Sequence, residues 1–177
     1  MSAVEGAMRR IRYLVATSLD GYIAGPNGEA DWIIMDPDID FGEIFSQFYT
    51  ALMGRRTFEG MVSAGNGLMP GMETVVFSRT LQQTDRPNVS IVADKPEEAL
   101  ATLRAKPGKD IWLFGGGLLF RGLAEARLVD AIEVAVIPIL LGGGIPLLPP
   151  PTKRINLTLK AQKVYKTGIV SLNYAIT

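Results

Sequence analysis

The stretch "DIWLFGGGLLF", residues 110–120, places an apolar β-type run directly before three glycines and a second apolar segment. Glycine inside a strand or helix costs about 0.5–1 kcal/mol relative to alanine, so a triplet marks a junction between ordered elements. A strand, a glycine turn and a helix in this order point backbone N–H groups and a helix dipole at an approaching anion. The triplet therefore predicts either a tight strand-to-helix turn alone or a phosphate site.

Strands and helices alternate along most of the chain. β-type runs occupy 11–17, 73–77, 88–94, 110–114 and 131–141, and helical spacing appears at 41–52, 97–105 and 118–126. We expect Asp38 or Asp40 to cap the first helix, and Asp94 with Glu97 to form a capping box before the second. The stretch 157–176 reads as two strands that turn near residues 166–168. The pattern predicts one three-layer α/β domain over 10–177, with a mainly parallel sheet, an antiparallel C-terminal hairpin and a disordered extension at 1–9.

The composition excludes several classes of function. Lysine plus arginine and aspartate plus glutamate both number 18, so no basic excess favours nucleic acid or an anionic membrane. The chain has no cysteine and no histidine, which excludes thiolate catalysis, a serine-histidine triad and the common zinc motifs, and we expect no metal site. Neither a signal peptide nor a membrane-spanning run is apparent. We expect a soluble, cytoplasmic protein with a small-molecule partner.

Two further strand ends carry groups that suit a phosphate. "MGRRTFEG" contains Gly54, Arg55, Arg56 and Thr57 at a strand-to-helix junction, and "FSRT" brings further groups of this kind to the end of another strand. Guanidinium groups pair with phosphate in bidentate fashion, and ligands of open parallel sheets collect at the carboxyl ends of the strands. A solvated surface pair is the alternative for the two arginines. The dinucleotide fingerprint and the Walker pattern are both absent.

Five stretches, taken together, carry a resemblance to a known family: "LVATSLDGYIAG", "ALMGRRTFEG", "TVVFSRT", "DIWLFGGGLLFRGL" and "LVDAIEVAVIPILLGGGIPLL". Their order and spacing resemble the dihydrofolate-reductase fold family. More narrowly, they are similar to the reductase domain of the riboflavin-pathway bifunctional deaminase/reductase and its stand-alone relatives. The resemblance covers the chain from about residue 10 to its end. It implies a dihydrofolate-reductase-like sheet with NADPH lying across the strand ends.

The resemblance also implies roles for individual residues. Those expected to bind NADPH are Gly54, Arg55, Arg56 and Thr57 at the phosphates, Ser78 and Arg79 beside the 2′-phosphate with Arg55, Gly115, Gly116, Gly117, Leu118 and Leu119 at the pyrophosphate, and Ala16 and Ile23 at the nicotinamide. The second triplet, Gly142, Gly143 and Gly144, is characteristic of the riboflavin-type branch. It reads either as a turned strand exit or as a substrate-side or dimer-side segment.

The acid that supplies a proton is less constrained. Counting back from "MGR" leads to Asp38 as the acidic residue of the substrate pocket, and Asp20 in "SLDG" is a second candidate. Helix capping for Asp38 and turn stabilisation for Asp20 remain alternatives.

By resemblance, the reaction is the NADPH-dependent reduction of 5-amino-6-(5-phosphoribosylamino)uracil in riboflavin biosynthesis, within a wider scope of carbonyl, imine or pterin-like acceptors. The alternatives are dihydrofolate reductase activity and a non-catalytic nucleotide-binding protein of the same fold. Relatives of this branch commonly pair, and an apolar content of 47% with the stretch "VIPILL" allows a homodimer here.

Overall fold

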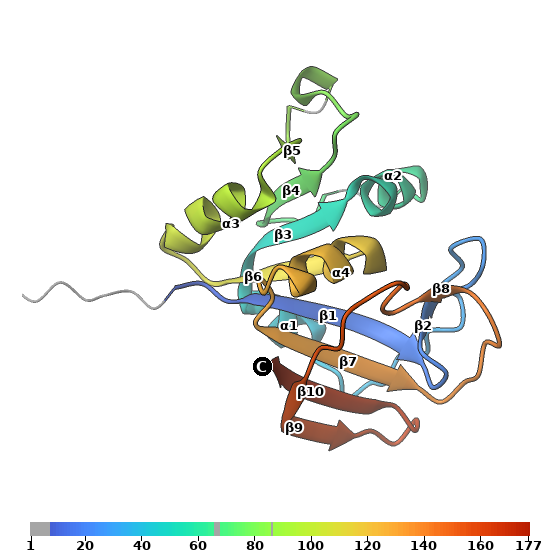
Figure 1. The fold of residues 1–177 in the computed structure, drawn as a ribbon. Coiled ribbons are helices and arrows are strands. Elements are labelled where there is room, and N and C mark those ends of the chain that lie inside the picture. The colour runs from blue at the N-terminus through green and yellow to red at the C-terminus, as the bar shows by residue number, and fades with distance from the viewer. Residues whose placement is uncertain (1–7, 66–67, 86) are drawn as a thin grey trace, which may run out of the picture.

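An eight-stranded sheet forms the centre of the protein (Figure 1), and the computed structural model describes residues 8–65, 68–85 and 87–177. The strand order is β5-β4-β3-β6-β1-β7-β10-β9, and a second sheet pairs β2 with β8. The strands are β1 (Ile11–Ser18), β2 (Tyr22–Ala24), β3 (Phe48–Gly54), β4 (Glu73–Phe77), β5 (Ser90–Val92), β6 (Asp110–Gly115), β7 (Ala131–Ile137), β8 (Ile145–Pro146), β9 (Leu157–Val164) and β10 (Val170–Ile176).

The first six strands of that order, β5 to β7, pair in parallel, whereas β10 pairs antiparallel with both β7 and β9. The expected α/β class, the mainly parallel sheet and the antiparallel C-terminal hairpin are therefore confirmed. The helices are α1 (Phe41–Ser46), α2 (Arg55–Ser63), α3 (Pro96–Ala105) and α4 (Gly117–Glu125), with a short 3-10 turn at Gln83–Asp85.

Helices cover both faces of the sheet. Tyr13 of β1 stacks on Phe120 of α4 with ring centroids 4.3 Å apart, within a core that also contains α3 side chains. On the opposite face, Met53 of β3 packs with Phe58 of α2 in a second cluster. In Figure 1, α4 lies in front of the sheet and α1 behind it. These two cores complete the three layers that the alternation of strands and helices predicted.

The helix expected over 41–52 is wrong in its second half, because α1 ends at Ser46 and β3 begins at Phe48. Within β3, Phe48, Thr50, Ala51 and Leu52 are all buried, since this central strand has a helix layer on each face. Apolar residues on both faces of a strand mimic helical spacing.

The predicted caps have mixed outcomes. Asp40 caps α1, as its Oδ1 accepts a hydrogen bond from the backbone N–H of Glu43 at 2.8 Å. The capping box before α3 is wrong, because Lys95 holds the N-cap position with a left-handed backbone and makes no side-chain cap bond. Pro96 at the start of that helix has no N–H to cap.

The expected disordered extension at 1–9 lies largely outside the described residues, which begin at Met8. Arg9 differs from that expectation, since only 3% of it is exposed and its guanidinium donates to Thr50 Oγ1 at 2.7 Å. The ordered structure therefore includes Arg9.

Candidate functional site

The sheet opens between β1 and β6 toward the carboxyl ends of the two strands. They pair only from Ile11↔Ile111 to Tyr13↔Leu113. Beyond that point β1 continues to pair with β7 as far as Ser18, and β6 pairs with β3 as far as Gly115. This break in the hydrogen-bonded ladder, here called the sheet opening, lies at the end of the sheet where α/β folds bind their ligands.

Two helices begin beside the sheet opening. Gly54 is the N-cap of α2 and Gly116 the N-cap of α4, and neither helix has a side-chain cap bond among the described residues. A Cβ placed on Gly54 would lie 4.0 Å from Gly115 O, and one placed on Gly116 would lie 3.3 Å from Thr57 Oγ1. The two helix N-termini are thus adjacent, and free N–H groups at such ends favour an anion.

The glycines of the first triplet differ in what they do. Gly115 has φ +144°, which disfavours other residues, and a Cβ there would meet nothing within 4 Å. A Cβ on Gly117 would lie 2.8 Å from Pro146 O and 2.9 Å from Pro149 Cδ. Gly115 therefore leaves open space for a ligand, whereas Gly117 is required by the proline segment packed against α4.

A cleft of about 320 Å³ lies between the ends of β4 and β5 and the helices α3 and α4. We call it the strand-end cleft. It is lined by Phe77, Ser78, Arg79, Val92, Ala93, Pro96, Glu97, Leu118, Leu119, Gly122, Leu123, Ala126 and Leu128. The side chain of Ser78 is buried and its Oγ accepts hydrogen bonds from Thr80 N and Leu81 N, while Arg79 is exposed. Four residues expected at the cofactor thus share one cavity.

Arg55 lies close to this cleft, because Gly54 and Phe77 are register partners on neighbouring strands. Its Nη1 forms an ion pair with Glu59 at 3.0 Å, and both side chains are about two-fifths exposed. Pairs of this kind contribute only about 0.3–0.5 kcal/mol, so the arginine can exchange its partner for a phosphate. Arg56 is exposed to solvent.

A second cavity, of about 250 Å³, lies on the α1 face of the sheet. We call it the apolar pocket. It is lined by Leu14, Val15, Ala16, Ile33, Ile34, Met35, Ile39, Phe41, Ile44, Phe45, Trp112, Glu133, Ala135, Ile137, Tyr165, Ile169 and Ser171. Ala16 lies on its wall, whereas Ile23 on β2 lines neither cavity.

Neither acidic residue expected in the substrate pocket lines it. Asp38 is 56% exposed and lies 3.8 Å from Lys166 Nζ. Asp20 accepts hydrogen bonds from Ser18 Oγ at 2.6 Å and from the backbone N–H groups of Leu141 and Gly142. These bonds, that of Ser18 foremost, lower the pKa of Asp20 below its ordinary value. A carboxyl held in this way is suited to anchoring a loop rather than to donating a proton.

The second glycine triplet packs against the loop that follows β1. Gly142 N donates to Asp20 Oδ2 at 2.7 Å, and a Cβ on Gly144 would lie 2.2 Å from Ala24 O. The strand before it ends at Ile137, ahead of Pro138. This geometry supports the interpretation as a turned strand exit.

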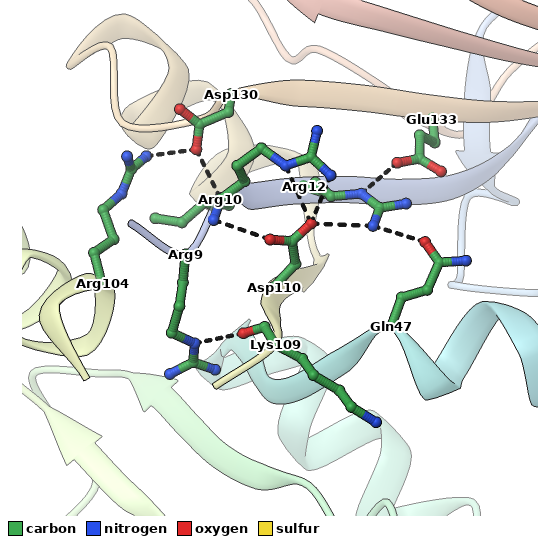
Figure 2. Close-up of polar contacts among 10 residues, drawn as sticks. Arg9, Arg10, Arg12, Gln47, Arg104, Lys109, Asp110, Asp130 and Glu133 are labelled. Carbon is green, nitrogen blue, oxygen red and sulfur yellow. Dashed lines mark hydrogen bonds and ion pairs between the residues drawn. The ribbon is translucent and has the colours of Figure 1, made fainter. Parts of the chain in front are cut away.

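Sequence reasoning missed Glu133, the carboxylate on the wall of the apolar pocket. Its Oε1 accepts a hydrogen bond from Arg12 Nε at 2.6 Å, and Arg12 also contacts Asp110 and Gln47 (Figure 2). Burial disfavours the charged form of Arg12, but the carboxylates of Glu133 and Asp110 outweigh it and its pKa is raised. A single glutamate inside the apolar run "AIEVAVI" was the available signal.

Neither a metal-binding cluster nor a membrane-spanning helix is found among the described residues. Within the ranges 8–65, 68–85 and 87–177, no group of three or more acidic side chains could hold a metal ion. Over the same ranges, no helix has the length and apolar character needed to cross a membrane.

Comparison with known proteins identifies the family. The sequence pattern of the RibD C-terminal domain matches residues 9–171. The chain belongs to this family. It is 36% identical over 178 residues to YyaP of Bacillus subtilis (strain 168), a protein of uncharacterised function, with 94% of each chain covered. The chain spans nearly the whole length of that relative.

Solved structures agree with the family. A protein from Shewanella sp. PV-4, provisionally assigned to riboflavin biosynthesis, matches with a TM-score of 0.81 and 27% identity over 95% of this chain and 99% of its own. Dihydrofolate reductase from Enterococcus faecalis, solved with NADP(H), matches with a TM-score of 0.68 and 21% identity over 95% and 96% of the two chains. The dihydrofolate-reductase-like fold is therefore shown, and family membership supports a reductase-like role.

Proposed function

We propose that this protein is an NADPH-dependent reductase that transfers a hydride to a small carbonyl, imine or pterin-like acceptor. One observation carries the proposal: the sheet opening lies between a cleft lined by the exposed Arg79 and a pocket with apolar walls. Leu118 and Leu119 of α4 line the strand-end cleft, Gly115 borders the opening, and Ala16 lines the apolar pocket. An extended dinucleotide laid across this edge would reach from one cavity to the other.

The residues at this edge fit such a cofactor. The adjacent, uncapped N-termini of α2 and α4 would hold the pyrophosphate, with Thr57 between them and open space at Gly115. Arg79 and Arg55 would bind the 2′-phosphate at the neighbouring ends of β4 and β3. When bound, the nicotinamide supplies the hydride. Dihydrofolate reductase from Enterococcus faecalis, which shares this fold, was solved with NADP(H), and this supports the choice of cofactor.

The chain's own part in the reaction is to position the acceptor and keep water away from it. Apolar side chains from the 33–39 segment, α1 and the β9–β10 hairpin close around the pocket. Reduction also requires a proton, and neither Asp20 nor Asp38 lines the apolar pocket to donate it. Asp38, which precedes the pocket residue Ile39 and lies beside Lys166, stays a prediction for this role, acting from solvent.

An NADPH oxidation assay over a panel of carbonyl, imine and pterin compounds tests the proposal. We expect turnover with at least one compound, and Asp38→Asn shows whether that carboxyl supplies the proton. If the protein binds NADPH tightly but oxidises it with no compound of the panel, the result supports the alternative of a non-catalytic nucleotide-binding protein. An unchanged rate in Asp38→Asn removes that residue from the mechanism and leaves the reductase class intact.

The homodimer also stays a prediction. Edge strand β9 is exposed along its whole length and carries Leu157, Leu159 and Val164, which are 45%, 48% and 71% exposed. Light scattering on the full chain would give the mass of the particle. A monomer at high protein concentration would contradict the expectation.

A further inference from the structure

The apolar pocket contains one carboxylate, and no arginine or lysine is among the described residues that line it. Apart from Glu133, its polar side chains are Trp112, Tyr165 and Ser171. The indole N–H of Trp112 already faces Leu14 O at 3.4 Å. A ligand that enters this pocket therefore meets apolar walls and, in Glu133, a hydrogen-bond acceptor.

Half of the Glu133 carboxylate is available to a ligand. Oε1 is occupied by Arg12 Nε, whereas Oε2 has no hydrogen-bond partner in the described part of the chain (Figure 2). The side chain is 20% exposed, and Glu133 reaches the pocket wall. The side chain of Arg12 is only 8% exposed and forms ion pairs with both Glu133 and Asp110. The arginine thus fixes the carboxylate from one side and leaves its other oxygen to accept.

The register gives the depth of this group. Ala16 pairs with Ala135, and Leu14 pairs with Glu133, two residues nearer the amino ends of the strands. Two residues along a strand rise about 7 Å, which is about the length of a flat two-ring heterocycle. A flat molecule that donates a hydrogen bond to Glu133 would then present its far edge near Ala16, where the resemblance places the nicotinamide.

The charges of the pocket oppose a phosphate. A phosphate dianion in this pocket would meet the Glu133 carboxylate and no cation among the described residues that line it, because Arg12, which pairs with Glu133, does not line the pocket. The cations near the rim lie outside: Lys166 is 92% exposed beside Asp38, and Lys163 Nζ stands 4.5 Å over the Tyr165 ring. Neither lysine lines the pocket. The volume of about 250 Å³ also suits a compact ligand, since drug-sized sites start at about 300 Å³.

We propose that Glu133 is the specificity-determining residue of the apolar pocket, and that it selects a compact, unphosphorylated conjugated ring with an N–H donor. This inference rests on the proposed function for its meaning as substrate selection. The substrate of this pocket would then carry no phosphoribosyl group.

Calorimetric titrations of the full chain with three probes test this. The probes are 2,4-diaminoquinazoline, which offers N–H donors, quinazoline, which is the same ring without them, and uridine 5′-monophosphate, which carries a phosphate. A hydrogen bond to a charged group corresponds to a factor of about 10–100, so we expect diaminoquinazoline to bind about tenfold or more tightly than quinazoline. Uridine 5′-monophosphate should bind most weakly.

Two variants separate recognition from a purely structural role. Glu133→Gln keeps the size of the side chain but replaces the anionic acceptor by a neutral amide, so the preference for the diamino ring should fall several-fold. Asp110→Asn is the matched control, because Asp110 also pairs with Arg12 but does not line the pocket. It should keep the wild-type preference. An equal loss in both variants, or an unchanged preference in Glu133→Gln, would overturn the proposal.

If Glu133→Gln does not fold, titrations of the wild-type protein alone still test the inference. Quinazoline binding as tightly as its diamino derivative, or uridine 5′-monophosphate binding most tightly, would contradict the inference. A parallel NADPH titration of each protein keeps the two claims apart. NADPH binding without a ring preference defeats this inference alone, whereas a ring preference without NADPH binding defeats only the reductase proposal.

Discussion

Arginines at the amino ends of the parallel strands form ion pairs within the protein, whereas those at the carboxyl ends are largely exposed. At the amino ends, Arg10 and Arg12 share Asp110, and Arg104 pairs with Asp130 at 2.7 Å (Figure 2). At the carboxyl ends, Arg56 and Arg79 are exposed, and two helices begin without a side-chain cap. Each of these arginines at the amino edge has a carboxylate partner within the protein, whereas Arg56 and Arg79 at the carboxyl edge point donors toward solvent.

This contrast separates structural from functional arginines more clearly than the sequence does. Arg9 and Arg12 are the most buried arginines of the amino edge, with 3% and 7% exposure, and each donates to several protein acceptors. Arg55 is intermediate, since its partner Glu59 is an exposed neighbour on the same helix. A guanidinium with all its partners in the protein stabilises the fold, and one with an exchangeable partner can bind a phosphate.

Removal of the central arginine of the amino edge should have the largest effect on stability. Arg12→Met would leave Glu133 and the partly buried Asp110 without their shared cation, and breaking such a pair costs about 3 kcal/mol. Urea unfolding of the variant measures this loss. Arg79→Ala at the carboxyl edge is the control and should change the free energy of unfolding by less than about 0.5 kcal/mol. Similar losses in the two variants would end the distinction between the edges.

Alanine substitutions within α4 test the dual role of the first triplet. In Gly117→Ala the new Cβ would meet Pro146 O at 2.8 Å, so we expect a loss of about 1–3 kcal/mol. In Gly122→Ala, on the same helix, the Cβ would meet nothing within 4 Å, and the higher helix propensity of alanine should leave stability unchanged or raise it by up to about 1 kcal/mol. Thermal denaturation of both variants gives the comparison. A Gly117→Ala protein as stable as the wild type would show that packing against the proline segment does not require this glycine, and would leave ligand binding as its role.

The ion pair of Arg55 offers a way to sharpen the contrast. Glu59→Gln removes the carboxylate that holds the guanidinium at 3.0 Å. The free energy of unfolding should fall by only about 0.3–0.5 kcal/mol, as for other exposed pairs one helical turn apart. Titration with NADPH should show an affinity raised about twofold to fivefold, because the arginine is then free for the 2′-phosphate. Weaker binding would show that Glu59 positions Arg55 rather than competes for it.

Acid should weaken the amino edge through Asp110. Burial acts to raise the pKa of this carboxyl, but Arg10 and Arg12 prevail and the pKa lies below its ordinary value. A group with a lowered folded-state pKa contributes stability above its unfolded pKa of about 3.9 and loses it as the pH falls through the folded value. Urea midpoints below about pH 4 should therefore fall less steeply in Asp110→Asn than in the wild type. Parallel acid limbs would contradict the assignment.

The local elements were largely predictable, and the exceptions have physical reasons. The hairpin of β9 and β10 and the turn between them follow from alternating residues and from Gly168 with φ +88°. The segment 48–52 was misread because a central strand is apolar on both faces. Lys95 took the cap position from Asp94 because Pro96 already provides the first helical residue.

The candidate site was predictable where short motifs carry it and obscure where distant residues meet. The glycines and arginines at three strand ends were visible from the sequence, and Ser78, Arg79, Leu118 and Leu119 do share a cavity. The role of Asp20 depends on Gly142, which lies 122 residues away, and Glu133 depends on Arg12, which lies 121 residues away. No local pattern encodes such pairs, so the anchor of the loop and the carboxylate of the pocket emerge only in the fold.

Calorimetric titration of the wild type and Arg79→Ala with NADPH and NADH tests the central claim most directly. We expect NADPH to bind the wild type at least about tenfold more tightly than NADH, because the 2′-phosphate gains charge-assisted hydrogen bonds at the carboxyl edge. Arg79→Ala should remove most of that preference and leave NADH binding nearly unchanged. Equal affinities for the two nucleotides in the wild type, or no binding of either, would contradict the account of a phosphate-binding carboxyl edge.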